Sequence, residues 1–224
     1  MSLSLIIPAY NEERRLPAFL ESIIAFKVTH PQLTTEVIIV DDGSTDTTAE
    51  IVRAYLPKIS GGRLIQLPKN LGKGAAVQAG VMAAASDKVV FIDADGATPI
   101  TELPHMNTAL DGAQIAIGNR WMKESKAHRS TPLRHLAGWV YKTYMSLFGL
   151  GGIDTMCGFK GYRRSVARDL FQHLIDSRWL FDTEIAYKAI RRGYIIKNVP
   201  IRWESKEGSK LSGKDLIESA LGIW

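Results

Sequence analysis

The chain has 224 residues, of which 46% are hydrophobic and 23% charged, the composition of an ordinary globular protein. This length suffices for one sizeable α/β domain with a substantial core. The single cysteine, Cys157, excludes an intramolecular disulfide and is typical of a reducing, cytosolic setting. No apolar stretch reaches the roughly 18 residues of a membrane-spanning helix. The short apolar N-terminus has no basic leader and meets Pro8, so we expect a first strand rather than a signal peptide.

The net charge of +5 is concentrated in one segment. Residues 119–142 hold six Lys or Arg and one acid, Glu124, whereas the remaining 22 basic and 22 acidic residues balance. A local excess of positive charge indicates an anionic partner. The chain lacks nucleic-acid-binding motifs, so we expect a membrane surface rather than a nucleic acid.

Apolar runs alternate with helical patterns through the first half. We expect strands at 3–7, 36–40, 63–67, 88–92 and 114–118, and helices around 16–24, 51–55 and 76–81. This alternation predicts a single α/β domain with a mostly parallel sheet and helices on both faces. Ligands of such sheets bind beyond the carboxyl ends of the strands. The polar clusters at 8–12, 41–46 and 93–95 should therefore meet in one crevice.

The second half has a different character. Residues 119–135 are basic and aperiodic, which indicates a mobile loop, and residues 136–150 are rich in apolar and aromatic side chains. Further patterns predict helices at about 164–175 and 183–192, the second closed by Gly193, a strand at 194–203 and a helical tail after Gly213.

Two carboxylates, Asp93 and Asp95, end the fourth predicted strand with one residue between them. Carboxylates so close together repel each other, and a hard divalent cation shared with a diphosphate would relieve that repulsion. Mg²⁺ or Mn²⁺ suits such a site, because these ions complete their shell with phosphate oxygens and water. The alternative is a pair of solvated loop acids, which are common.

Two further segments each allow two interpretations. In "VDDGSTD" (40–46), a turn and a helix cap explain every residue except the doubled Asp, so we expect Asp42 to accept hydrogen bonds from a base or a ribose rather than to cap. The segment "KNLGKGAAVQAG" (69–80) fits neither the Walker nor the GxGxxG pattern. Two interpretations remain for this segment. It is either a glycine-rich helix start in which Lys73 forms a modest anion site, or a helix that packs tightly against the sheet.

The motifs "IIPAYNE", "VDDGSTD", "NLGKGAA" and "DADG" follow one another in the order found in the family-2 glycosyltransferases, and the chain resembles that family. The later motifs "GNR", "DTMCGFKGY", "RWLFDTEI" and "WESKEGSK" resemble the branch that glycosylates polyprenyl phosphates. Dolichyl-phosphate β-glucosyltransferases are most alike and mannose synthases come next. The resemblance covers most of the chain and implies the A-type nucleotide-diphospho-sugar transferase fold. It places the nucleotide sugar on residues 1–118 and the acceptor on residues 119–224.

The resemblance also implies roles for single residues. Pro8, Tyr10 and Glu12 would line the nucleoside pocket with Asp42. Asp93 and Asp95 would meet the diphosphate, with Asp95 as the main metal ligand. One departure is Ala97, where mannose synthases often carry a Gln that contacts the metal, and this favours the glucosyl branch.

The acceptor side is expected to be basic. The resemblance implies that Arg120 begins the acceptor loop and that Lys210 lies near the acceptor, and we expect Arg129 and Arg134 to hold the lipid phosphate or to attract the membrane. Residues 136–150 would form an interfacial helix, or alternatively a core helix. Asp182 has three open roles: an orienting or electrostatic group, a catalytic base, or an acid at a helix N-terminus. A phosphate acceptor is already anionic, so it scarcely needs a base.

These observations predict a metal-dependent enzyme that inverts the anomeric centre. It would transfer a hexose, in the first place glucose from UDP-glucose, to a polyprenyl phosphate on the cytoplasmic face of a membrane. GDP-mannose as donor, a saccharide as acceptor, and a basic membrane-docking module without catalytic activity are the alternatives.

Overall fold

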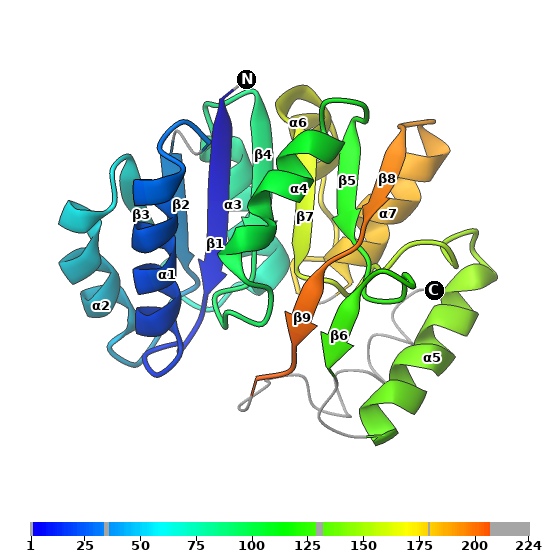
Figure 1. The fold of residues 1–224 in the computed structure, drawn as a ribbon, viewed down its shortest axis with the longest axis horizontal. Helices are drawn as coiled ribbons and strands as arrows, with labels where there is room; N and C mark the ends of the chain where they lie inside the picture. The colour runs from blue at the N-terminus through cyan, green and yellow to red at the C-terminus, as the bar shows by residue number, and fades with distance from the viewer. Residues whose placement is uncertain (1, 34–35, 129–131, 179, 207–224) are drawn as a thin grey trace.

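The computed structural model describes residues 2–33, 36–128, 132–178 and 180–206. Its centre is a seven-stranded sheet with the order β3-β2-β1-β4-β7-β5-β8, in which only β7 runs antiparallel to its neighbours (Figure 1). The predicted, mostly parallel sheet is therefore confirmed. The strands are β1 (Leu3–Ala9), β2 (Glu36–Asp41), β3 (Gly62–Gln66), β4 (Lys88–Ile92), β5 (Ile115–Gly118), β7 (Phe159–Arg163) and β8 (Ile196–Val199).

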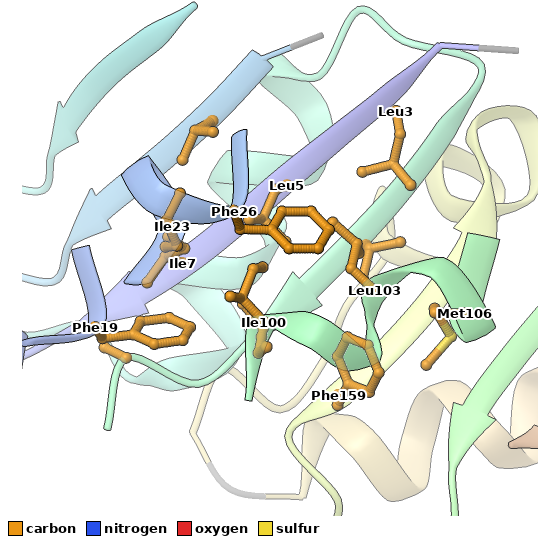
Figure 2. Packing of buried hydrophobic residues seen from close by; sticks show 14 of the residues in the cluster. Leu3, Leu5, Ile7, Phe19, Ile23, Phe26, Ile100, Leu103, Met106 and Phe159 are labelled. Carbon is orange, nitrogen blue, oxygen red and sulfur yellow. The ribbon is translucent and has the colours of Figure 1, made fainter. Parts of the chain in front are cut away.

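Helices cover both faces of this sheet, as predicted. Successive strand residues point to opposite faces, so Leu5 and Ile7 join one core and Ile6 joins the other. The first core is closed by α1 (Leu16–Thr29), α2 (Thr48–Tyr55) and α4 (Leu103–Ala109). Figure 2 shows its interlocked side chains. The second core is closed by α3 (Lys73–Ala83), α6 (Arg164–Phe171) and α7 (Phe181–Arg191). Two short 3-10 turns, η1 (Leu56–Lys58) and η2 (Ile100–Glu102), complete these layers.

Strand β7 was not predicted. Its sequence, "FKGYR", contains a lysine that is fully buried in the structure, so it lacks the apolar run of a central strand. The strand lies between β4 and β5, with Phe159 opposite Ile92. Because β7 is antiparallel to β4, it begins where β4 ends. The loop 154–158 is thereby brought beside Asp93.

The prediction of an aperiodic loop at 119–135 is wrong in part. Residues Lys126–His128 form β6, which pairs in parallel with β9 (Arg202–Glu204). The helix α5 then begins at Pro132 and ends at Ser146. Each strand of this small sheet finds its partner about 75 residues away, and no local pattern predicts such pairing.

Two other predicted boundaries also differ. The strand predicted at 194–203 is divided into β8 and β9, because Pro200 has no N–H to donate to a ladder. Helix α6 ends at Phe171 rather than at 175. Helix α7 ends as predicted, with Gly193 in a left-handed conformation at φ 70°. The predicted helical tail after Gly213 lies outside the described residues.

Candidate active site

The polar segments after β1 and β2 are bonded to each other. The Asn11 N–H donates to Ser44 Oγ at 2.9 Å, and Asn11 Oδ1 accepts the Thr45 N–H at 2.8 Å. Asn11 adopts φ 49°, a left-handed conformation that Asn tolerates better than most residues. The first two predicted ligand clusters therefore form one unit. Pro8 is buried at the end of β1, and Tyr10 is half-buried directly after it.

Asp42 connects this unit to the loop before α3. Its two carboxylate oxygens accept the N–H groups of Leu71 and Gly72, at 2.8 and 2.9 Å. Burial raises the pKa of Asp42, an effect that these two hydrogen bonds oppose and the neighbouring Asp41 reinforces. Asp42 thus has a role in the loop that the sequence did not reveal.

Helix α3 begins at Lys73, and its first turn packs closely on another segment. The N–H groups of Gly74 and Ala75 donate to the carbonyls of Arg178 and Ser177. A Cβ at residue 74 would lie 2.8 Å from the Cβ of Phe181 and 2.9 Å from backbone atoms of residues 176 and 177. Gly74 is thus required by a loop and α7, whereas the predicted helix–sheet packing is found at Gly80, where a Cβ would lie 2.4 Å from Ile6 of β1. The cationic group at this helix start is the Lys73 side chain.

Lys73 forms an ion pair with Asp93, with Nζ 2.6 Å from Oδ1. Burial by itself would lower the pKa of Lys73, but the carboxylates of Asp93 and Asp182 outweigh it and raise the pKa. The side chain is therefore an ammonium at neutral pH. It places a fixed positive charge at the carboxyl end of β4, where a diphosphate would bind.

Asp95 lies opposite Arg15, with 3.9 Å between Oδ2 and Nη1. Arg15 also holds Glu12 through two bonds, Nε to Oε2 at 2.7 Å and Nη2 to Oε1 at 2.5 Å. Burial, and then repulsion from Asp93, raises the pKa of Asp95. The loop after β1 thus supplies a guanidinium to the site. Glu12, predicted in the nucleoside pocket, orients that group.

The donors present fit a divalent cation of the Mg²⁺ or Mn²⁺ type. Among the described residues, no cluster of three or more His, Cys, Asp or Glu side chains could hold a metal alone. Asp93 and Asp95 instead supply the one or two carboxylates with which such an ion is bound when phosphate oxygens complete its coordination shell. Gly158 leaves room for this arrangement, since a Cβ there would lie 1.8 Å from Asp93 Oδ2.

Arg120 is held in one orientation beside the site. Its Nε and Nη2 donate to the two oxygens of Asp154 at 2.7 and 2.8 Å, and its backbone N–H adds a third bond at 3.0 Å. The guanidinium carbon of Arg120 also lies 5.0 Å from the centroid of the Trp203 ring, a cation–π contact. Burial would raise the pKa of Asp154, but the attraction of Arg120 outweighs it and holds that pKa below its usual value.

Asp182 is the second residue of α7 and is buried, with 5% of its surface exposed. Its Oδ1 lies 2.7 Å from Lys160 Nζ. Burial raises the pKa of Asp182, while Lys160 and Lys73 act in the opposite direction. The carboxylate is therefore one half of an interior ion pair, and it also lies in the first turn of α7, at the helix N-terminus where the sequence predicted it.

The rest of the predicted acceptor residues are not placed. Arg129 and Lys210 lie outside the described residues, and Arg134 belongs to α5 with a side chain that is likewise outside them. Three important partners were not predicted from the sequence: Arg15, Asp154 and Lys160. The last two belong to the motif "DTMCGFKGY", which the resemblance singled out without indicating which of its residues would form ion pairs.

Comparison with known proteins identifies the family of this chain. A family model described as glycosyl transferase family 2 matches residues 4–171. A dolichyl-phosphate beta-glucosyltransferase of Trichomonas vaginalis is 38% identical, over 97% of this chain and 68% of the relative. Proteins of the same name from Drosophila melanogaster and Homo sapiens are each 36% identical, covering 100% and 99% of this chain and 77% of each relative.

The fold has solved counterparts as well. Glucosyl-3-phosphoglycerate synthase from Mycobacterium tuberculosis, crystallised with Mn²⁺, UDP and glucosyl-3-phosphoglycerate, superposes with a TM-score of 0.74 at 22% identity. The alignment covers 99% of this chain and 79% of that one. This likeness establishes the A-type fold that the sequence motifs implied. The chain is a glycosyltransferase, and it belongs to glycosyl transferase family 2.

Proposed function

We propose that this chain transfers glucose from UDP-glucose to dolichyl phosphate or a closely related polyprenyl phosphate, with inversion at the anomeric carbon. The relatives named above support glucose as the transferred sugar and dolichyl phosphate as the acceptor, because they are dolichyl-phosphate beta-glucosyltransferases whose likeness extends over nearly the whole chain. One observation carries the proposal in the structure. Lys73 is paired with Asp93, and a second oriented cation, the Arg120 guanidinium held by Asp154, is close enough for the Asp93 charge to act on it.

The donor side neutralises the leaving diphosphate. Lys73 and Arg15 supply fixed positive charge next to Asp93 and Asp95, which would hold the divalent cation. When bound, that cation supplies further stabilisation of the negative charge on the departing nucleoside diphosphate. Both cations are held by ion pairs with these carboxylates, and preorganised charge of this kind accounts for a large part of enzymatic rate enhancement.

The acceptor side orients the attacking phosphate. A phosphate oxygen of the lipid forms the new bond to the anomeric carbon as the bond to the diphosphate breaks on the opposite face. This oxygen is already anionic at neutral pH, so no proton needs to be removed. The pairing of Asp182 with Lys160 supports an electrostatic role for that carboxylate, and Asp154 orients Arg120, the group that would meet the phosphate.

Helix α5 provides a surface for the membrane. The aromatic and aliphatic side chains of α5 and of the turn that follows it divide into two sets. Tyr141, Tyr144 and Phe148 pack inward around Met145 and Leu150. The outward set consists of Trp139, Val140 and Leu147, exposed by 55, 53 and 78%. No helix in the described part of the chain is both long and apolar enough to cross a membrane. We propose peripheral attachment to the cytoplasmic face through this helix and the basic residues around it.

A donor panel tests the proposed reaction. UDP-glucose, UDP-galactose and GDP-mannose are each incubated with Mn²⁺ and dolichyl phosphate, and the configuration of the product is read by NMR. We expect turnover with UDP-glucose and a β-linked product. A preference for GDP-mannose, or transfer to a saccharide and not to the lipid, would overturn the assignment.

A further inference from the structure

Lys160 in β7 is one of the most deeply buried charges of the described residues, with 1% of its surface exposed. Its ammonium donates to three oxygens: the carbonyl of Thr155 at 3.0 Å, the carbonyl of Cys157 at 2.5 Å and Asp182 Oδ1 at 2.7 Å. An ammonium has three N–H donors. All three are used within the protein, so Lys160 acts on other residues rather than on a substrate.

The loop 154–158, which Lys160 holds by two carbonyls, reaches both sides of the site. At its start, Asp154 orients Arg120 on the acceptor side. At its end, the Gly158 carbonyl accepts the Asp93 N–H at 3.0 Å, and the missing side chain at 158 makes room for the Asp93 carboxylate. The third bond of Lys160 fixes the first turn of α7 through Asp182. One ammonium thus joins the donor side, the acceptor side and α7.

We infer that Lys160 is a positioning residue that sets the loop 154–158, and through it both Asp93 and Arg120, in the geometry required for transfer. Stability alone does not explain a lysine here, because buried ion pairs can often be replaced by apolar residues without loss of stability. The kinetic part of this inference rests on the proposed function. The structural part, the order of the loop, does not.

The chain offers a matched control in Lys88 of β4. It is 2% exposed, and its ammonium also makes three bonds, to the Asn107 carbonyl, to Asn107 Oδ1 and to Asp111 Oδ1 at 2.9, 2.9 and 2.6 Å. It lies at the amino end of β4, away from the site. Lys88→Met therefore removes the same number of hydrogen bonds from a buried ammonium on the neighbouring strand.

Lys160→Met and Lys88→Met are compared first by hydrogen exchange of the free protein. The amides to follow are those of Asp93, Arg120 and Cys157, which bond to the loop or lie within it. We expect Lys160→Met to speed exchange at all three by about tenfold or more, and Lys88→Met to leave them unchanged. Equal exchange in the two variants would overturn the inference.

Kinetics with UDP-glucose and dolichyl phosphate form the second measurement. A misplacement of about 1 Å can cost roughly 10²-fold, so we expect kcat/KM of Lys160→Met to fall by about that factor, with a higher KM for the acceptor. Lys88→Met should stay within about threefold of wild type, although its Tm falls as well. If Met is not tolerated at 160, Lys160→Gln, which keeps two N–H donors, takes its place. A folded variant at 160 with wild-type kinetic constants would refute the positioning role. A wild-type enzyme inactive on the lipid would refute the proposed function, and hydrogen exchange would still decide the role of Lys160.

Discussion

Replacement of Gly158 by Ala should separate catalysis from stability. The added Cβ would lie 1.8 Å from Asp93 Oδ2 and 2.2 Å from Asp93 Cγ, whereas 3.4 Å is the lower limit of an ordinary contact. An ordinary contact therefore needs a separation 1.6 Å larger, the difference between 3.4 and 1.8 Å, and the carboxylate is the group that can move. The backbone does not oppose the change, because Gly158 is not among the residues with positive φ. The three atoms nearest to that Cβ all belong to the Asp93 carboxylate, so the effect should fall mainly on Asp93 and its partner Lys73.

The two consequences differ in size. The Lys73 and Asp93 side chains are 21 and 35% exposed, so loss of their ion pair should cost about 1 kcal/mol or less, a shift in Tm of roughly 2–4 °C. Displacement of a group that meets the reacting diphosphate should lower kcat/KM by about 10²-fold, or about 2.7 kcal/mol. Most of the effect should therefore appear in catalysis.

The assay compares Gly158→Ala with Gly152→Ala, using transfer of radiolabelled glucose to dolichyl phosphate and thermal unfolding. Gly152 lies in the same part of the chain, and a Cβ there meets nothing within 4 Å. Gly152→Ala should keep wild-type activity. A Gly158→Ala enzyme within about threefold of wild type would show that the position of Asp93 does not matter for transfer, and the reasoning would fail.

Three further predictions concern the metal, the acceptor side and the membrane. Chelation with EDTA should abolish turnover, and Asp95→Ala should lower it by orders of magnitude in a folded protein; full activity in excess EDTA would exclude the metal. Because Arg120 lowers the pKa of Asp154 in the folded state, the pair stabilises the protein at neutral pH and loses this effect as pH falls below the usual carboxyl range. Asp154→Asn should therefore cost about 1–3 kcal/mol near pH 7 and flatten the loss of unfolding free energy between about pH 5 and 3; parallel wild-type and variant curves would contradict this. Trp139→Glu should reduce flotation with anionic liposomes. The control Val28→Glu, at a site 76% exposed on α1, should not. Equal flotation of the two variants would show that α5 does not bind the membrane.

Much of the fold could be predicted from the sequence because it depends on local pattern. The apolar runs of the first four strands predict a parallel sheet. Apolar residues at helical spacing predict the helices that cover it. Since the carboxyl ends of parallel strands share one edge, the polar segments following them had to meet. The structure links these segments in turn, from Asn11 to Ser44, from Asp42 to Gly72 and from Lys73 to Asp93.

The tertiary structure alone decided how each charge is used. Lys160 and Asp182 are polar residues 22 positions apart, and nothing local predicts that they bury each other. Strand β7 escaped prediction for the same reason, because a central strand tolerates a lysine only when a distant carboxylate compensates it. Which side of α5 is exposed depended likewise on contacts with α7, such as the bond from Tyr141 to Thr183. Periodicity acts over a few residues, whereas the burial of a charge depends on whichever partner the completed fold brings to it.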